Sequence, residues 1–146
     1  MLSIKARSVC GSPRAEIGAK ADSRTAVQIP LSDVAALYSE GQRVMLRMRP
    51  NSRSQRIFGS MRFAVSHPLK ELEEMVAGRE FVRVNHGLII AITEVERIEE
   101  WCRRHFRIIA LGASRPIPVS RRRASEVLQM ANGAMIPLVP HSECRR

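Results

Sequence analysis

The stretch EFVRVNHGLIIAI, residues 80–92, decides the fold class of this chain. Two runs rich in apolar and β-branched residues, 80–84 and 88–92, flank the bend sequence NHG. Runs this short that are bounded by turn residues predict strands, here two strands joined by a tight turn. Turn residues also separate most of the similar runs that follow, which are 95–101, 105–111 and 115–120. The second half of the chain is therefore predicted to consist mainly of strands.

The first half also begins with strand-like sequence. Two extended segments lie on either side of a turn at Gly41, between residues 26 and 50. In the second of these segments, Val44, Leu46 and Met48 alternate with other residues that are mostly arginines, which predicts a strand with one exposed face. Residues 54–63 are predicted to pair beside that strand.

One segment in the middle of the chain has helical periodicity. Leu69, Leu72 and Val76 recur at helical spacing within SHPLKELEEMVAG, residues 66–78. Ser66 is expected to cap the helix, a proline suits its first turn, and Gly78 is expected to end it.

A second helix is predicted after Ser120, which is expected to be its N-cap. Arg121, Arg122 and Arg123 then occupy the predicted first turn. The amino end of a helix carries positive partial charge and unpaired N–H donors, so three arginines are unfavourable there without an anion. The sequence therefore predicts that an anionic partner binds at this position.

The predicted architecture is mostly β, a β-rich α+β fold of small packed antiparallel sheets with one mid-chain helix and a short C-terminal helix. We predict a flexible basic arm at 1–25, a domain at 26–131 and a C-terminal tail at 132–146. The predicted core residues are Leu46, Leu69, Leu72, Phe81, Ile90, Val95, Ile98 and Ile108. Trp101 is predicted to be a packing residue.

Positive charge is concentrated in two parts of the chain. The 24 lysines and arginines outnumber the 14 acidic residues, which gives a formal net charge of +10. Residues 42–63 and 103–123 contain many arginines and no acid, while the acids gather at 71–74 and 94–100. Such segregation favours a polyanionic partner over a uniformly charged surface.

Several functional classes lack their motifs. The sequence contains no glycine-rich phosphate loop, no His-Glu-x-x-His pattern and no Gly-x-Ser-x-Gly elbow, so we do not expect an enzyme. Cys10, Cys102 and Cys144 have neither metal-ligand spacing nor an even number, so we expect no metal, no disulfide framework and a reducing, cytoplasmic setting. The apolar runs are too short to cross a membrane, and no cofactor is predicted.

Two stretches, EFVRVNHGLIIAITEVERIE (80–99) and IPVSRRRASEVLQ (117–129), resemble a LytTR DNA-binding domain. That family shows Phe-x-Arg-x-His-Arg-Ser before an apolar run that ends in Asn, and a Pro-Val-Ser-Arg-Arg-like segment later. This chain has Asn-His-Gly in place of His-Arg-Ser, and Ala91 in place of the Asn. The similarity covers about residues 28–130.

The resemblance implies a small β-rich fold that binds double-stranded DNA through loops in the major groove rather than through a recognition helix. Carried over by position, the implied DNA-binding residues are Gln42, Arg43, Asn85, His86, Arg121 and Arg122, and Arg123 is expected to bind DNA beside them. Arg121 is expected to bind a guanine edge, and Arg122 and Arg123 to hold phosphates. His86 is expected to donate to guanine or to phosphate, and Asn85 or Gln42 to pair with adenine.

The family also implies a transcription regulator, here a stand-alone one because only about 25 residues precede the domain. The further partners that the family implies are a second copy of the chain, as a homodimer on direct repeats, and an unidentified regulatory protein. Two alternatives stay open. One is an RNA-binding module, although the aromatic platform typical of sheet-surface RNA binders is missing. The other is a basic protein-interaction domain with an acidic partner.

Overall fold

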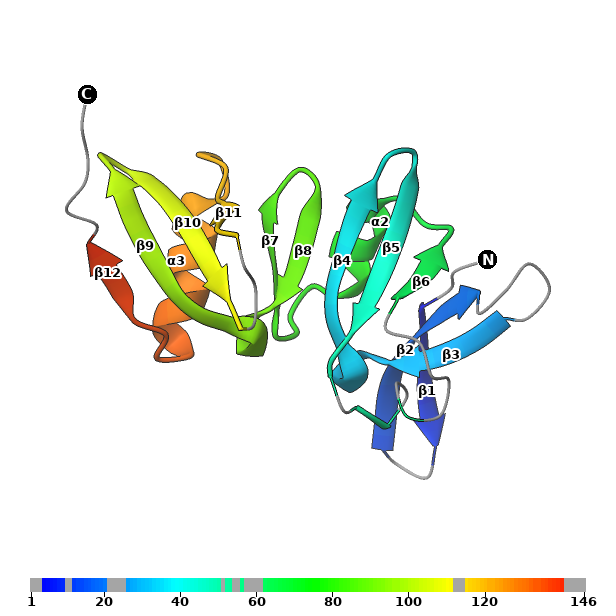
Figure 1. Ribbon diagram of the computed structural model, residues 1–146. Coiled ribbons are helices and arrows are strands. Elements are labelled where there is room, and N and C mark those ends of the chain that lie inside the picture. Colours follow the sequence, from blue (N-terminus) through cyan, green and yellow to red (C-terminus); the bar gives the residue numbers. More distant parts are fainter. Residues whose placement is uncertain are drawn as a thin grey trace. The chain divides into compact units, whose positions relative to one another are not determined.

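The computed structural model describes residues 4–9, 12–20, 26–50, 52–53, 56, 62–111 and 115–140. The chain divides into two compact units, unit 1 (Met1–Ala77) and unit 2 (Gly78–Arg146). Strands dominate both units, and each described helix belongs to one of them (Figure 1). The predicted mostly β fold class is therefore confirmed.

The strands of unit 1 form one sheet. They are β1 (Ile4–Val9), β2 (Ser12–Lys20), β3 (Ala26–Pro30), β4 (Val34–Glu40), β5 (Arg43–Met48) and β6 (Arg62–Val65). Hydrogen-bonded neighbours follow the order β1-β2-β6-β5-β4, and β3 pairs with β2. A 3₁₀ turn, Leu31–Asp33, connects β3 to β4. The predicted partner strand at 54–63 begins only at Arg62, and most of the preceding segment lies outside the described residues.

The segment predicted as an arm without regular structure instead contains β1 and β2. The two strands pair antiparallel, with Ile4 opposite Ile17, and β2 then pairs with β3. Ile17 is fully buried, as is Ile29 opposite it in β3. The small and polar residues of β1 and β2 give no strand pattern in the local sequence, because this pair depends on cross-strand neighbours and not on local periodicity.

The β4–β5 hairpin closes through a two-residue turn. Glu40 lies opposite Arg43, so Gly41 and Gln42 form the turn between them. Gly41 has φ +63°, and a positive φ at the first turn position belongs to the type II′ hairpin turn, which favours glycine there. Leu46 and Met48 are fully buried, as the alternating pattern predicts.

The mid-chain helix is α2 (Leu69–Met75), which packs against β4. Leu69, Leu72 and Val76 are buried, so the predicted apolar face is confirmed. The helix starts later than the sequence pattern predicts: Pro68 is its N-cap and Ser66 is not. Proline restricts the preceding residue to extended backbone, which explains the delayed start.

Unit 2 begins with the hairpin of β7 (Phe81–Asn85) and β8 (Leu88–Ala91). A 3₁₀ turn, Ile92–Glu94, leads into β9 (Val95–Cys102) and β10 (His105–Ala110). Then follow β11 (Ile117–Pro118), α3 (Ala124–Gly133) and β12 (Leu138–Pro140). The last four strands form a second sheet in the order β11-β10-β9-β12, in which β12 runs parallel to β9.

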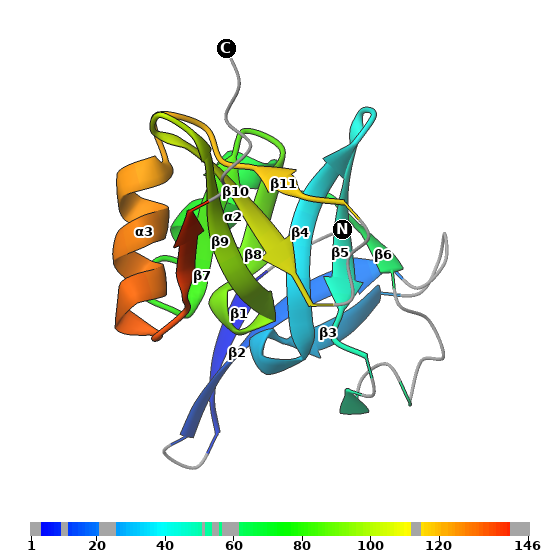
Figure 2. The same ribbon diagram turned by 60° about the vertical axis from the view of Figure 1, so that its left-hand side comes forward.

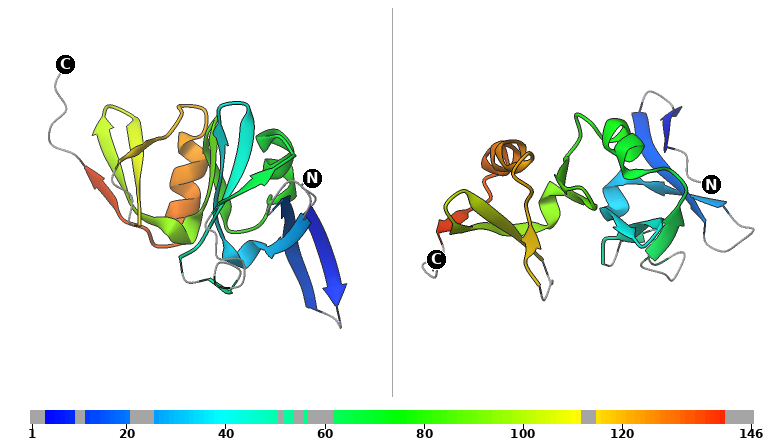
Figure 3. Two further views of the ribbon diagram at one scale, coloured as in Figure 1. Left: turned by 45° about the vertical axis from the view of Figure 1, so that its right-hand side comes forward. Right: turned by 90° about the horizontal axis from the view of Figure 1, so that it is seen from above.

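Helix α3 covers one face of this second sheet, as the view from above shows (Figure 3). Ile98 and Ile108 are opposite each other in β9 and β10, and both are buried. Val127 and Ala131 are the buried residues of α3. Together these apolar side chains account for the core on this side of the sheet.

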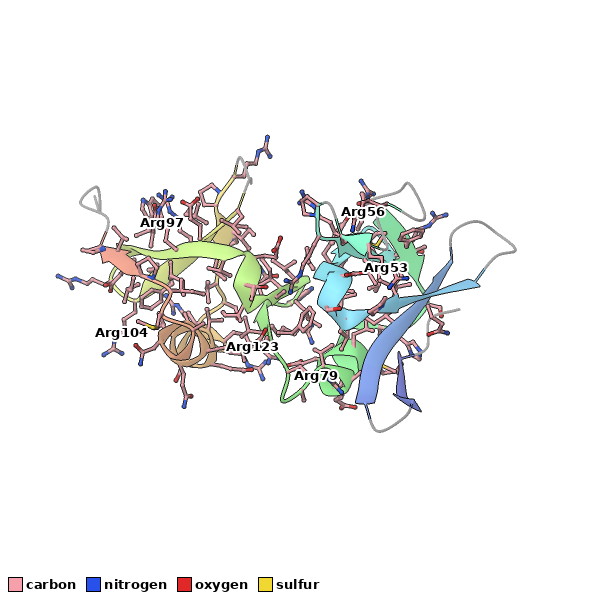
Figure 4. The ribbon with its side chains drawn as sticks, turned by 90° about the horizontal axis from the view of Figure 1, so that it is seen from below. Arg53, Arg56, Arg79, Arg97, Arg104 and Arg123 are labelled. Atoms are coloured by element: carbon pink, nitrogen blue, oxygen red, sulfur yellow. The ribbon has the colours of Figure 1, made fainter. Side chains whose placement is uncertain are left out.

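The opposite face of the second sheet carries charged residues. Glu99 is 8% exposed, and its carboxylate accepts hydrogen bonds from Arg107 (2.8 Å) and Arg97 (3.0 Å). Figure 4 shows Arg97 on the side of β9 away from α3. Burial raises the pKa of the Glu99 carboxyl. The hydrogen bonds and charges of the two arginines lower it by more than burial raises it, so the pKa lies below its usual value.

All eight predicted core residues are buried. The prediction for Trp101 is wrong, because 47% of this residue is exposed. Its ring lies under the Arg107 guanidinium, 5.9 Å from the ring centroid. Trp101 stands at a register shift between β9 and β10, where Phe106 pairs with Glu100 and His105 pairs with Cys102. Such a bulge depends on how the partner strand pairs, so the sequence of residues 95–101 alone does not predict it.

Candidate nucleic-acid interface

The turn between β7 and β8 is held by its own side chains. The Asn85 carbonyl Oδ1 accepts a hydrogen bond from the Gly87 N–H at 2.8 Å. The Arg83 guanidinium donates to the backbone carbonyls of Asn85 (3.2 Å) and His86 (2.8 Å). These contacts fix the backbone around His86, whose side chain is exposed.

The turn is also tied to the segment that carries the three arginines. The Asn85 side-chain amide Nδ2 donates to the Pro118 carbonyl at 2.8 Å. The Ser120 N–H donates to the Val84 carbonyl at 3.0 Å. The β7–β8 register shifts between Arg83 and Asn85, so Val84 is an extra residue in β7. A bulge of this kind takes one residue out of the strand pairing, so the Val84 carbonyl is available to accept the hydrogen bond from the Ser120 N–H.

These bonds bring two of the three predicted contact regions together. The β7–β8 turn and the segment leading into α3 lie at the same end of unit 2 (Figures 1 and 2). His86, Arg121 and Arg122 are all exposed there. Neither Arg121 nor Arg122 has an ion pair among the described residues. We call this set of three exposed side chains the basic end of unit 2.

The sequence pattern predicts the three arginines in the first turn of the helix, but they lie just before it. Helix α3 begins at Ala124 with Arg123 as its N-cap, so Ser120 is not the cap. Residues 121–123 instead form a turn, which the hydrogen bond from the Arg123 N–H to the Ser120 carbonyl closes at 3.0 Å. The arginines are thus presented just before the helix, and the expected conflict with its positive end is reduced.

Arg123 differs from its two neighbours. It is only partly exposed, and its Nη1 lies 3.6 Å from the carboxylate of Glu126 in the first turn of α3. Glu126 is an acid at the helix amino end, where it is favourable. A phosphate would therefore compete with Glu126 for Arg123, whereas Arg122 has no such competition among the described residues.

The third predicted region, Gln42 and Arg43, belongs to unit 1. Both side chains are exposed at the tip of the β4–β5 hairpin. The acid nearest to them in sequence, Glu40, is bound by the Arg62 guanidinium through both carboxylate oxygens, at 3.0 and 2.8 Å. An acid that is already paired repels a phosphate less than a free one does, so the tip is suited to an anion.

Two groups of residues were missed by sequence reasoning. Arg83 braces the β7–β8 turn, and its place in the Phe-x-Arg pattern was the available signal. Arg103 and Arg104 are exposed at the β9–β10 turn, inside the acid-free block 103–123, whose sequence predicts positive charge but gives these two residues no role of their own. Neither role follows from composition, because both depend on the fold of a turn.

Other kinds of site find no support in the described residues. They contain no cluster of three or more His, Cys, Asp or Glu side chains placed to hold a metal ion. No described helix is long and apolar enough to span a membrane.

Comparison with known proteins agrees with this geometry. The profile of the LytTr DNA-binding domain family matches residues 24–132. The fold is similar to the solved LytTr DNA-binding domain of a response regulator from Bacillus cereus, with a TM-score of 0.62 and 16% identity. That match covers 79% of this chain and 94% of the other. No curated protein matches the sequence. The family profile spans most of the chain, and this protein therefore belongs to the LytTr DNA-binding domain family.

Proposed function

We propose that this protein is a transcription regulator that reads specific sequences of double-stranded DNA through loops in the major groove. The observation that carries the proposal is the bonded frame of Asn85, Pro118, Ser120 and Val84. It holds the turns that carry His86 and Arg121 together at one end of unit 2. Preorganised, exposed donors favour specific recognition because little side-chain and backbone freedom is lost on binding.

The proposed roles follow from donor chemistry. Arg121 pairs with guanine O6 and N7, because a guanidinium matches both acceptors at once. Arg122 and Arg123 bind phosphates, which position the protein without reading bases. His86 donates to guanine or to phosphate. Gln42 and Arg43 supply the contacts of unit 1, with Gln42 on an adenine edge.

Asn85 is proposed to act mainly by positioning. Its Oδ1 and Nδ2 are each engaged within the protein, with Gly87 and Pro118. Pairing with adenine requires one donor and one acceptor from the same amide, and these contacts occupy both sides of it. Any contact of Asn85 with DNA would use the remaining amide hydrogen or lone pair.

Binding-site selection from random duplex DNA at physiological salt is the direct test. A regulator of the proposed kind enriches a defined sequence, and two copies arranged as direct repeats would indicate a homodimer on DNA. Retention of structured RNA without duplex enrichment would instead support the RNA-binding alternative. Binding that ignores sequence would leave only a basic interaction domain.

Arg121→Ala provides the residue-level test. We expect a loss of about 1–3 kcal/mol on the selected site and relaxed preference at one base pair, because one bidentate contact disappears. Electrophoretic shifts on a panel of single-base variants of the site measure both effects. Arg79→Ala is the matched control, since Arg79 is exposed and precedes β7, at the end of that strand opposite the β7–β8 turn. An Arg121 variant with unchanged base discrimination would contradict the role.

A further inference from the structure

The turn between β9 and β10 combines positive charge with an unfavourable backbone conformation. Cys102 pairs with His105, so Arg103 and Arg104 alone form the turn. Arg103, Arg104 and His105 are all exposed. Arg104 has φ +60°, in the left-handed region that glycine and asparagine adopt most readily.

An arginine is a poor choice for this position on folding grounds. The left-handed conformation brings a side chain's Cβ close to the backbone, and glycine avoids that cost. The Arg104 side chain offers no compensation, because no hydrogen bond or ion pair of its guanidinium occurs among the described residues. Only its backbone N–H is engaged, with the Glu100 carboxylate at 3.4 Å. Conformations disfavoured by the local sequence cluster at functional sites.

The position of this turn in unit 2 points to its function. The β9–β10 turn lies at the same end of the unit as the β7–β8 turn and the segment leading into α3, in both views of the ribbon (Figures 1 and 2). The basic end therefore continues from His86, Arg121 and Arg122 to a second pair of arginines.

The acids near the turn do not cancel this charge. Glu99 is on the sheet face away from α3 and is bound by Arg97 and Arg107. Glu100 is partly buried and caps the turn backbone. Two arginines thus face solvent beside one nearby carboxylate, and a phosphate backbone is the polyanion that such a tip fits.

We propose that Arg103 and Arg104 form an additional phosphate-binding element that grips the DNA backbone next to the bases read from the basic end. This inference rests on the proposed function and extends it to a turn outside the predicted contact regions. The contact is independent of sequence, so it adds affinity and salt dependence without changing which base pairs are preferred.

The experiment compares an Arg103→Ala/Arg104→Gly double variant with the unsubstituted chain. Fluorescence anisotropy measures binding to the selected duplex and to a scrambled duplex of equal length across a series of KCl concentrations. About 0.9 counterion is released per phosphate contact, so two lost contacts should reduce the salt slope by about 1.8. At 0.15 M salt, this corresponds to about thirtyfold weaker binding of both duplexes.

Arg104→Gly alone separates function from folding. Glycine suits φ +60°, so the melting temperature should stay the same or rise while affinity for both duplexes falls about fivefold at 0.15 M salt. Arg79→Ala serves as the charge-matched control and should change neither the slope nor the affinity.

The outcomes distinguish the two proposals. Unchanged salt slope and affinity in the double variant, with a normally binding unsubstituted chain, would overturn only the role of this turn. A loss confined to the selected duplex would also overturn it, because it would mean base reading. An unsubstituted chain that binds no duplex DNA would overturn both this inference and the proposed function.

Discussion

Glu99 shows how a single residue organises one face of the second sheet. It is the only charged residue that is buried among the described residues. Arg97 of β9 and Arg107 of β10 both bind its carboxylate. A buried carboxylate is tolerated only when partners replace the lost water. Arg107 then serves two purposes, since its guanidinium also lies over the Trp101 ring, 5.9 Å from the ring centroid.

Glu99→Gln should destabilise the protein near neutral pH by about 1–3 kcal/mol, because two charge-assisted hydrogen bonds are weakened. The folded-state pKa of Glu99 lies below its usual value of 4.5, so its contribution is complete above that value. The contribution is lost as the pH falls through the lowered folded-state pKa. Calorimetric melting at stepped pH should therefore show the difference between wild type and variant shrinking in acid.

Glu96→Gln is the control for this experiment. Glu96 pairs with the same Arg97 but is exposed, and exposed ion pairs contribute little to stability. Its variant should unfold within about 0.5 kcal/mol of wild type. A constant difference between wild type and Glu99→Gln down to strongly acid pH would mean that the arginines do not stabilise the ionised carboxylate.

Hairpin turns present several of the proposed contact residues, namely Gln42, Arg43 and His86. In the β4–β5 turn, Gly41 has φ +63° and no neighbouring atom within 4 Å of where a Cβ would be. A substitution there therefore tests backbone conformation alone. The neighbouring turn residue, Gln42, is one of the proposed base contacts.

Gly41→Ala should lower the free energy of unfolding by about 1–2 kcal/mol, the cost of placing an L-residue in the left-handed region. Urea unfolding followed by circular dichroism measures it. Gly133→Ala is the matched control: this glycine ends α3, has equally open surroundings, and should gain up to about 1 kcal/mol from better helix propensity. Equal stability of Gly41→Ala and wild type would show that the turn adopts another conformation.

The element scale also shows what sequence could and could not predict. Strands such as β5, β7, β8 and β9 follow from local periodicity, since each strand's own residues alternate or form a short apolar run. The pair β1 and β2 was missed, because its residues are small and polar and its order comes from partner strands. The start of α3 was predicted too early, since Ser120 is engaged by Val84 and not by the helix.

The candidate site was predictable in part for a similar reason. The positions of Arg121 and His86 came from a family resemblance and from charge clustering, both visible in the chain. The frame that joins their turns came only from the fold, because a bulge at Val84 and an amide shared between Gly87 and Pro118 leave no local pattern. The same holds for the left-handed Arg104.

At the scale of the whole molecule, charge is the dominant property. A net charge of +10 on 146 residues predicts steep salt dependence for any binding to DNA. The arginines are also segregated from most acids along the chain, which favours directed contacts over a general attraction.

Arg122→Ala should weaken binding to every duplex by about the same factor, roughly fivefold at 0.15 M salt, and flatten the salt slope by about 0.9. Titrations at several salt concentrations, with selected and scrambled duplexes, provide the measurement. Arg79→Ala again supplies the control for lost charge alone. An effect of Arg122→Ala restricted to one sequence would show that this residue reads a base.

The second sheet ends on both sides in very short strands that contain proline. In the described part of the chain, its outer strands are β11, of two residues, and β12, of three, and each finishes with a proline that has no N–H to donate. Brief, proline-bearing borders discourage a neighbouring molecule from extending a sheet by strand addition. Two copies side by side on DNA would consequently keep separate sheets, and their spacing would be set by the duplex rather than by a continuous β-structure.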